Sequence, residues 1–368
     1  MNIGIPKEVR PLEKRVGLTP PAVDALVRAG HTVIVEHEAG LEAGFKDEDY
    51  LSVGAQIVYS HKEACGRADM VVKIGRPTEE EYPCFHRHQI IMSYLHLAVA
   101  SPDLLEVFEK EEITAIGYET IQTDEGRLPV LEVTSEVAGR MAPIIAGELL
   151  DSIAGGRGIL ISGIPGVAPA AVVVLGGGVL GFNAARAFYN MGAQVMVLDK
   201  DRDILRMIDN YFNGKISTML SSPHNIAKAV SFADILVCAA AVPGGRAPTL
   251  VTREMLTKMR PKAVILDYAI NSGGNVETSR PTTLANPWYL EENIIHYCVP
   301  NVPARVARSA SYAFSNAALP FVLEIANEGI TQAMKHQPAL RRGVNVFEGK
   351  LIHAQVAAAM GKKAEKIE

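Results

Sequence analysis

The stretch VVVLGGGVLGFNAARAFYNMGAQVMVLDKD, residues 172–201, restricts the fold of this chain more than any other. An apolar run is followed by three glycines at GxGxxG spacing (Gly176, Gly178 and Gly181), an amphipathic run, and a second apolar run that ends at Asp199. In a strand–turn–helix of this order, the glycines let the backbone approach a pyrophosphate, and N–H groups at the helix start bind it. A carboxylate about 20 residues further on binds a ribose 2′-hydroxyl. The pattern therefore predicts a Rossmann unit.

Asp199 also indicates which dinucleotide this unit takes. A carboxylate at that place repels the 2′-phosphate of NADP and accepts a hydrogen bond from the ribose of NAD. Lys200 and Arg202 nearby weaken this preference without reversing it. The expected cofactor is NAD.

Short apolar runs alternate with amphipathic runs in two successive series. The expected strands are 2–5, 32–36, 70–74, 89–95 and 114–119 in the first series, and 171–176, 194–199, 234–241, 263–270 and 294–299 in the second. Expected helices include 20–30, 101–111 and 312–340, and the Gly-, Pro- and Ala-rich residues 121–168 are expected to cross between the series. Such alternation predicts parallel sheets covered by helices.

The expected fold is α/β, with two Rossmann-like domains whose parallel sheets flank a cleft. Residues 1–128 plus 308–368 are expected to form a substrate-binding, catalytic domain, into which an NAD-binding domain of residues 129–307 is inserted. A chain of 368 residues has the length of two such domains.

Composition excludes several classes of function. The net charge of −5 offers no basic face to nucleic acid or to an anionic membrane, and no apolar run has the length of a membrane span. The four cysteines form no CxxC pair, so neither a zinc site nor a disulfide framework is expected, and no metal site is predicted. The first residues lack the order of a signal peptide, which favours a cytoplasmic location.

The chain resembles the alanine dehydrogenases, which share a superfamily with the nicotinamide-binding part of proton-pumping transhydrogenase. The segments that carry the resemblance are IPKE (5–8), EKRVGLTP (13–20), YLHLA (94–98), GYETIQ (117–122), TSEVAGRMAP (134–143), GIPGVAPA (163–170), VPGGRAP (242–248), GGNVETSRPTT (273–283) and SNAALPFVL (315–323). The resemblance implies reversible, NAD-dependent oxidative deamination of a small L-amino acid to a 2-oxo acid and ammonia. It also implies a homo-oligomer, commonly a hexamer.

The resemblance further implies roles for individual residues. Arg15 matches the arginine that grips the substrate carboxylate, and His96 matches the histidine that exchanges protons with the substrate. Other positions that match substrate-binding residues are Lys73, Tyr94, Glu119 and Asn301. Positions that match NAD-binding residues are Ser135, Gly176, Gly178, Val179, Leu180, Gly181, Asp199, Ser221, Ala241 and Val299.

Two positions depart from the family pattern. Relatives carry Lys-x-Lys-x-Pro where this chain reads KIGRP, so Lys73 matches the first lysine and Gly75 replaces the second, substrate-contacting one. Asn271 stands where relatives carry a catalytic aspartate, so it keeps that residue's shape without its charge. Lys73, or Arg76 if the strand bends at Gly75, could replace the missing cation.

These departures leave three interpretations open. The chain is an amino-acid dehydrogenase of the alanine dehydrogenase type, with weak activity or a shifted substrate. Alternatively, it is an opine-type or imine oxidoreductase for a bulkier substrate, or a non-catalytic NAD-binding paralogue.

Overall fold

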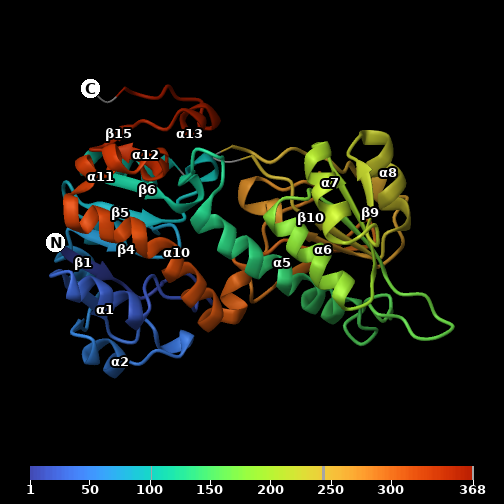
Figure 1. Ribbon diagram of the computed structural model, residues 1–368, viewed down its shortest axis with the longest axis horizontal. Coiled ribbons are helices and arrows are strands. Elements are labelled where there is room, and N and C mark those ends of the chain that lie inside the picture. Colours follow the sequence, from blue (N-terminus) through green and yellow to red (C-terminus); the bar gives the residue numbers. More distant parts are fainter. Residues whose placement is uncertain (101, 243–244, 367–368) are drawn as a thin grey trace. The chain divides into compact units, whose positions relative to one another are not determined.

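A computed structural model of the chain describes residues 1–100, 102–242 and 245–366. The chain divides into two compact units (Figure 1). The first consists mainly of Met1–Thr134 and Pro303–Glu368, and the second of Ser135–Val242 and Arg246–Val302. The sequence analysis placed the boundaries after residues 128 and 307, a few residues from these.

The first unit contains a sheet in the order β15-β14-β6-β5-β4-β1-β2-β3. Strands β1 to β6 are parallel, whereas β14 and β15 add an antiparallel edge. The strands are β1 (Asn2–Ile5), β2 (Thr32–Glu36), β3 (Gln56–Val58), β4 (Met70–Val72), β5 (Ile90–Ser93), β6 (Thr114–Gly117), β14 (Val344–Phe347) and β15 (Lys350–Leu351).

Helices cover both faces of this sheet. Side chains of α1 (Pro20–Arg28), α10 (Ala307–Glu328), α11 (Ile330–His336) and α12 (Pro338–Gly343) pack with Ile90 and Met92 of β5. Side chains of α3 (His61–Gly66), α4 (Pro102–Lys110) and α13 (Ala354–Ala359) pack with Ile91 on the other face. Alternate residues of a buried strand therefore enter different cores, as the period of two requires. A further helix, α2 (Asp47–Ser52), adds Tyr50 to the first core.

The second unit contains a sheet in the order β12-β13-β11-β10-β7-β8-β9, parallel except for β12. Its strands are β7 (Ala171–Leu175), β8 (Gln194–Asp199), β9 (Ser217–Leu220), β10 (Ile235–Cys238), β11 (Val264–Asp267), β12 (Trp288–Glu291) and β13 (Ile294–Tyr297). The helices are α5 (Pro129–Leu150), of which residues 135–150 belong to this unit, α6 (Val179–Asn190), α7 (Arg202–Tyr211), α8 (Pro223–Phe232) and α9 (Arg253–Leu256).

Both sheets follow the same strand order. The first strand of each unit, β1 or β7, lies in the middle, with the next two strands on one side and the later parallel strands on the other. This is the order of the doubly wound fold, in which ligands bind outside the carboxyl ends of the strands where the order reverses. The predicted α/β fold with largely parallel sheets is confirmed.

Some predicted elements were wrong in extent. Residues 312–340 do not form one helix, because Gly329, with φ of 77°, separates α10 from α11, and Pro338 begins α12. Residues 129–150, expected to be part of a crossing segment, form the helix α5. Strands expected at 70–74 and 234–241 are shorter, at β4 and β10.

Ser101, with which a predicted helix begins, and Pro243 and Gly244 of the VPGGRAP segment lie outside the described residues. In the part of the chain that the structure describes, every helix is too short or too polar to cross a bilayer.

Candidate functional site

In the first unit, the predicted substrate-binding residues lie where parallel strands end. Arg15 follows β1, Lys73 follows β4, Tyr94 and His96 follow β5, and Glu119 follows β6. Because β1, β4, β5 and β6 are neighbours and parallel, their carboxyl ends meet at one edge of the sheet. The fold thus brings to one edge residues that are far apart in sequence.

Arg15 is held by a neighbour that the sequence analysis did not single out. Its Nε and Nη2 atoms donate to the two carboxylate oxygens of Glu13, each at 2.7 Å. Both side chains are buried. Burial lowers the pKa of Arg15, but the charge and hydrogen bonds of Glu13 outweigh it and raise the pKa above its ordinary value. Arg15 is therefore a charged, fixed guanidinium with Nη1 outside this fork.

Lys73 lies in the interior. Its side chain is 0% exposed, and Nζ lies 2.6 Å from Glu81 Oε1 and 3.5 Å from Glu8 Oε2. Burial lowers the pKa of Lys73, but the two carboxylates together raise it. Glu81 also faces His61 at 3.3 Å, and its pKa is lowered to about 2 because these cations and Thr78 outweigh its burial. The predicted substrate contact of Lys73 gains no support from this position.

Gly75 lies beside Glu8 and Arg10. Its N–H and that of Ile74 donate to the Glu8 carboxylate. A β-carbon at Gly75 would lie 3.1 Å from Glu8 Oε2 and 3.2 Å from Arg10 Cδ. The side chain of Arg10 therefore borders the space into which a larger residue at this position would extend.

The segment after β4 turns so that Arg76 approaches His96. Arg76 Nη1 donates to the His96 carbonyl oxygen at 3.4 Å, and Arg10 Nε donates to the Arg76 carbonyl oxygen at 2.9 Å. Burial, followed by the charge of Arg10, lowers the pKa of Arg76. Arg76 was predicted as a possible replacement for the missing cation, whereas Arg10 was not predicted.

His96 has a constrained backbone and a lowered pKa. Its φ of 45° is left-handed, a conformation that costs a non-glycine residue energy and recurs at functional sites. The N–H donates to Glu119 Oε1 at 2.7 Å. Burial lowers the pKa of the imidazole; Glu119 opposes this, whereas Arg76 and Arg10 add to it. A neutral imidazole at neutral pH is a proton acceptor.

The ring of Tyr94 stacks near that of His96. The two rings are nearly parallel with centroids 6.0 Å apart, and the Tyr94 hydroxyl donates to the Val130 carbonyl oxygen at 2.9 Å. That hydroxyl also lies 3.1 Å from Thr134 Oγ1. Burial raises the pKa of Tyr94, so the phenol stays protonated.

In the second unit, the glycine motif joins β7 to α6 as predicted. A β-carbon at Gly181 would lie 1.8 Å from the Gly176 carbonyl oxygen, so this glycine allows close packing of the helix on the turn. Gly176 has φ of 96°, which requires the conformational freedom of glycine. Next to Gly178, which precedes the first residue of α6, a β-carbon would meet nothing within 4 Å. That open position at the start of α6, where helix N–H groups point outward, fits a pyrophosphate.

Asp199, the last residue of β8, faces this turn. Its Oδ2 accepts from the Gly177 N–H at 2.6 Å, and its Oδ1 accepts from the Asp201 N–H at 2.8 Å. The Ser221 N–H, just after β9, donates to the Asp199 carbonyl oxygen at 2.8 Å. The carboxylate thus lies beside the glycine turn, where a ribose would follow a bound pyrophosphate.

The other predicted cofactor residues lie on segments around the same edge of the second sheet. Ala241 follows β10, Val299 follows β13, and Leu180 lies in the first turn of α6. Ser135 lies on α5. Gly139 of that helix is close to α6, since its β-carbon would lie 2.5 Å from the Leu180 carbonyl oxygen.

Asn271 lies in the short helix that follows β11. Its Nδ2 donates to the Pro300 carbonyl oxygen at 2.8 Å, which places it beside the segment that carries Asn301. The loop is fixed by the buried Asp267, which accepts from the Asn275 N–H at 2.9 Å and from Ser279 Oγ at 2.6 Å. Burial raises the pKa of Asp267 despite these hydrogen bonds.

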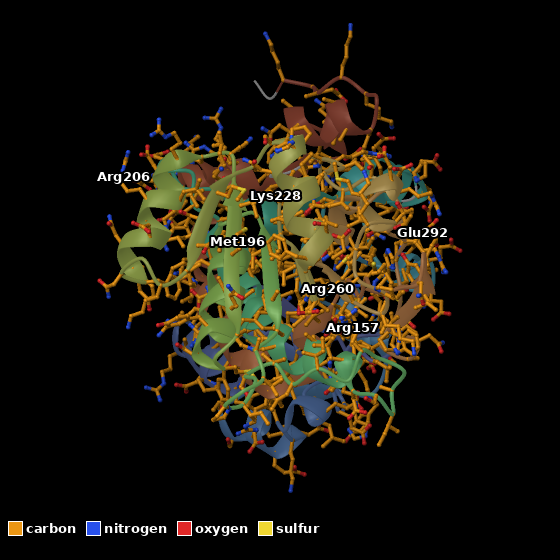
Figure 2. All side chains as sticks on the ribbon, turned by 90° about the vertical axis from the view of Figure 1, so that its right-hand side faces the viewer. Arg157, Met196, Arg206, Lys228, Arg260 and Glu292 are labelled. Carbon is orange, nitrogen blue, oxygen red and sulfur yellow. The ribbon has the colours of Figure 1, made fainter. Side chains whose placement is uncertain are left out.

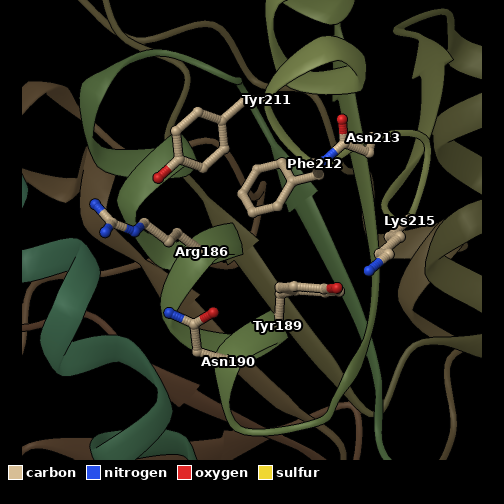
Figure 3. Close-up of a pocket in the computed structure, with 7 residues that line it drawn as sticks. All are labelled: Arg186, Tyr189, Asn190, Tyr211, Phe212, Asn213 and Lys215. Atoms are coloured by element: carbon tan, nitrogen blue, oxygen red, sulfur yellow. The ribbon is translucent and has the colours of Figure 1, made fainter.

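The opposite end of the second sheet is built differently. Asp234, just before β10, pairs with Arg260 at 2.9 Å and with Arg157 at 3.3 Å, two residues labelled in Figure 2. A hollow of about 260 Å³ lies near the carboxyl ends of α6 and α7 and is lined by Arg186, Tyr189, Asn190, Tyr211, Phe212, Asn213 and Lys215 (Figure 3). Gly178 lies at the other end of α6, so this hollow is separate from the glycine turn.

One group of residues in the first unit could hold a cation. The ligand atoms of Glu324, Glu328 and His336 lie within 4.8 Å of one another, with Glu328 and His336 exposed. No metal site was predicted, and this group lies on α10 and α11, where the neighbouring Asn327 contacts His31 just before the amino end of β2.

Glu8, Glu13, Glu81 and Arg10 contribute to the first edge and were missed. Glu8 and Glu13 lie within the quoted IPKE and EKRVGLTP segments, so two acids on either side of Arg10 were an available signal. Their partners follow β4 or lie in the same loop, and the sequence did not reveal that pairing.

Comparison with known proteins places both units. The N-terminal domain described as alanine dehydrogenase/PNT matches residues 4–138, and the corresponding C-terminal domain matches residues 142–354. The chain is 44% identical over 360 residues to an alanine dehydrogenase of Methanococcus maripaludis, covering 98% of this chain and 96% of that one. It is 45% identical over 363 residues to an alanine dehydrogenase of Bacillus subtilis, covering 98% and 95%. A solved L-alanine dehydrogenase matches with a TM-score of 0.91 at 42% identity, covering 98% and 99%.

Proposed function

Because the chain belongs to the alanine dehydrogenase/PNT family, we propose that it is an NAD-dependent amino-acid dehydrogenase acting on L-alanine. The reaction is L-alanine, NAD⁺ and water giving pyruvate, ammonia, NADH and a proton, and it is reversible. The observation that supports the proposal is that Arg15 and His96 both follow parallel strands of the first sheet and both lie near Tyr94. A carboxylate-binding cation and a proton-exchanging group are what this chemistry needs.

We assign substrate binding to Arg15 and proton exchange to His96. The fork between Arg15 and Glu13 fixes the guanidinium, so binding a carboxylate at Nη1 requires little reordering. The lowered pKa of His96 favours the neutral imidazole, which accepts the proton released as water attacks the imine in deamination. Glu119 holds the His96 backbone, and Tyr94 lies against its ring.

NAD would be held in the second unit. The residues that fit it are the glycine turn at Gly176 to Gly178, the first turn of α6, and Asp199. When bound, NAD⁺ accepts the hydride that leaves the substrate Cα. The carboxylate of Asp199 favours NAD over NADP.

The two departures at Gly75 and Asn271 bear on the rate. Removing one preorganised group that stabilises developing charge typically costs roughly 3 kcal/mol. We therefore propose slower turnover than relatives with both residues would give. The alternative of a bulkier, opine-type substrate assumed that Gly75 leaves space for the substrate. Arg10 Cδ and Glu8 Oε2 lie close to that position, which disfavours this alternative.

The test is NADH oxidation by the purified protein with pyruvate and ammonia, compared with other 2-oxo acids and with ammonia replaced by amino acids. We expect turnover to require ammonia and to be highest with pyruvate. Faster turnover with an amino acid as the amine would favour the opine-type alternative. Tight NADH binding without turnover of any combination would favour the non-catalytic one.

We also propose that the protein is a cytoplasmic homo-oligomer, a hexamer if it follows the resemblance. Several apolar side chains of the second unit are exposed in the single chain: Ile153, Leu160, Ile164 and Val167. Exposed apolar side chains grouped along one segment are typical of interaction surfaces. Light scattering at micromolar concentration would give the mass, and a monomer of 39.6 kDa would contradict the proposal.

A further inference from the structure

Arg10 and Arg76 form a pair of cations at the first-sheet edge, and neither is in an ion pair with another described residue. Both are half-buried. Arg10 donates a hydrogen bond to the Arg76 carbonyl oxygen, and Arg76 donates one to the His96 carbonyl oxygen. Among the described residues, no carboxylate oxygen lies within 4.0 Å of either guanidinium, whereas Arg15 and Lys73 nearby are each paired with glutamates.

This arrangement is unfavourable unless an anion joins it. Burial and then the charge of Arg10 lower the pKa of Arg76, against smaller opposing effects of Tyr82, Glu119 and Asp103, so the two guanidinium groups repel each other. Glu8, the nearest acid to Gly75, is engaged by the N–H groups of Ile74 and Gly75. Partly buried charges are usually paired or bind a ligand. The pair is therefore suited to an anionic ligand.

The position of the two arginines indicates which kind of anion they bind. Arg76 contacts the His96 backbone, and His96 is the proton-exchanging group in the proposed function. Arg10 borders Gly75, where a longer cationic side chain would otherwise reach the same region. A guanidinium fork binds a carboxylate through two parallel hydrogen bonds.

We propose that Arg10 and Arg76 bind a carboxylate group of the substrate beside His96. The proposal rests on the proposed function for the identity of the substrate, a 2-oxo or amino acid. It assigns to two arginines from different loops the positive charge that Gly75 cannot supply. That carboxylate is the α-carboxylate shared with Arg15, or a second carboxylate on the substrate side chain.

The test compares R10Q and R76Q with the wild type by calorimetric titration of pyruvate and of oxaloacetate into the NADH complex. Charge-assisted hydrogen bonds contribute enough that we expect each substitution to raise Kd by roughly 10- to 100-fold. The Kd for NADH should stay unchanged, since both arginines belong to the first unit. Arg28, an exposed arginine of α1 paired with Asp24, gives the matched control R28Q, which should change neither Kd.

The two acids separate the two sources of the carboxylate. Equal losses for pyruvate and oxaloacetate assign the pair to the α-carboxylate. A larger loss for oxaloacetate assigns it to a second carboxylate. A Kd within twofold of the wild type for both acids, in variants that keep the wild-type Tm, overturns the proposal, as does a wild-type complex that binds neither acid.

A second set of variants tests whether Arg10 and Arg76 act through their charge or through packing. Replacing Arg10 by Ala removes the side chain that borders Gly75, so R10A/G75K returns a cation to the same region. We expect R10A/G75K to bind pyruvate at least fivefold more tightly than R10A, and R76K to lose less affinity than R76Q. If the lysine restores nothing, Arg10 acts through packing alone and its part of the proposal fails. Because these are affinities, a wild type that binds 2-oxo acids without turnover contradicts the proposed function but not this proposal.

Discussion

The two units use one strand order to present different chemistry. In the first, the loops after β1, β4, β5 and β6 carry charged or titratable side chains, such as Arg15 and His96. In the second, the turn after β7 carries glycines, and backbone N–H groups are its polar groups. The fold determines where a ligand binds, and the residues in the loops determine which ligand it is.

Buried charged groups at the two sheet edges have different kinds of partner. Lys73 is 0% exposed and is stabilised by Glu8 and Glu81, since a buried ion needs a partner. Asp267 of the second unit is stabilised by backbone N–H groups and Ser279. The first edge therefore depends on ion pairs, whereas the second depends on backbone geometry. Substitutions should have separable effects on the two.

The largest effect is expected for H96Q. Loss of a group that exchanges protons with the substrate costs roughly 10²–10⁴ in kcat. The Kd for NADH should be unchanged, because the cofactor residues belong to the other unit. His224, an exposed histidine at the start of α8, provides the control H224Q. A tenfold weaker NADH binding in H96Q would contradict the separation of the two functions.

The next largest effect is expected for K73M, which should lower the free energy of unfolding. Removing this ammonium leaves the buried Glu8 without its cation and leaves Glu81 with only His61, which costs about 3–5 kcal/mol of unfolding free energy. Chemical denaturation followed by circular dichroism measures it. K62M, at an α3 residue with an exposed side chain, is the control. Unchanged stability together with a raised KM for pyruvate would instead show that Lys73 contacts the substrate.

Two glycine substitutions in the second unit should have different consequences. A β-carbon at Gly178 meets no protein atom within 4 Å, so G178A should keep the wild-type Tm and weaken NADH binding roughly tenfold by loss of about one charge-assisted hydrogen bond. G181A should lower both the Tm and the affinity for NADH, because its β-carbon collides with the Gly176 carbonyl oxygen. G147A, where the added carbon makes an ordinary contact with Ile161, is the control. Wild-type NADH binding in G178A would remove the glycine turn from the cofactor site.

The smallest effect concerns acid stability in the first unit. The pKa of Glu81 in the folded protein is about 2, below its ordinary value of 4.5, so its ionised form stabilises the fold above pH 4.5. That contribution is lost as the pH falls from 4.5 to about 2. Glu8 acts in the opposite direction, because burial raises its pKa. The unfolding free energy should fall less steeply over this range in E81Q than in the wild type; equal slopes would contradict the assignment.

Regular elements were predictable where pattern and turn signals agree. Strands β1, β2 and β8 have the predicted ends, because a polar residue or proline bounds each apolar run. The helix α5 was missed because Gly139, Pro143 and Gly147 resemble loop signals. Gly139 instead allows α6 to approach, a tertiary contact that overrides its low helix propensity.

The candidate sites were predictable in part for the same physical reason. The glycine turn and Asp199 belong to one continuous segment, so their spacing carried the information. The contacts of Arg10 with the Arg76 backbone and of Lys73 with Glu8 join loops about 66 residues apart. Such pairs depend on the path of each loop after its strand, and hydrophobic periodicity in the sequence does not predict that path.

The most direct test of the proposed function follows the hydride from NADH and the nitrogen from ammonia into the product. The protein is incubated with NADH deuterated at nicotinamide C4, pyruvate and ¹⁵N-ammonia, and the product is analysed by mass spectrometry and chiral chromatography. The account predicts L-alanine carrying both deuterium at Cα and ¹⁵N, in amounts that fall at least 100-fold in H96Q. Deuterated lactate, an N-substituted amino acid or no labelled product would contradict it.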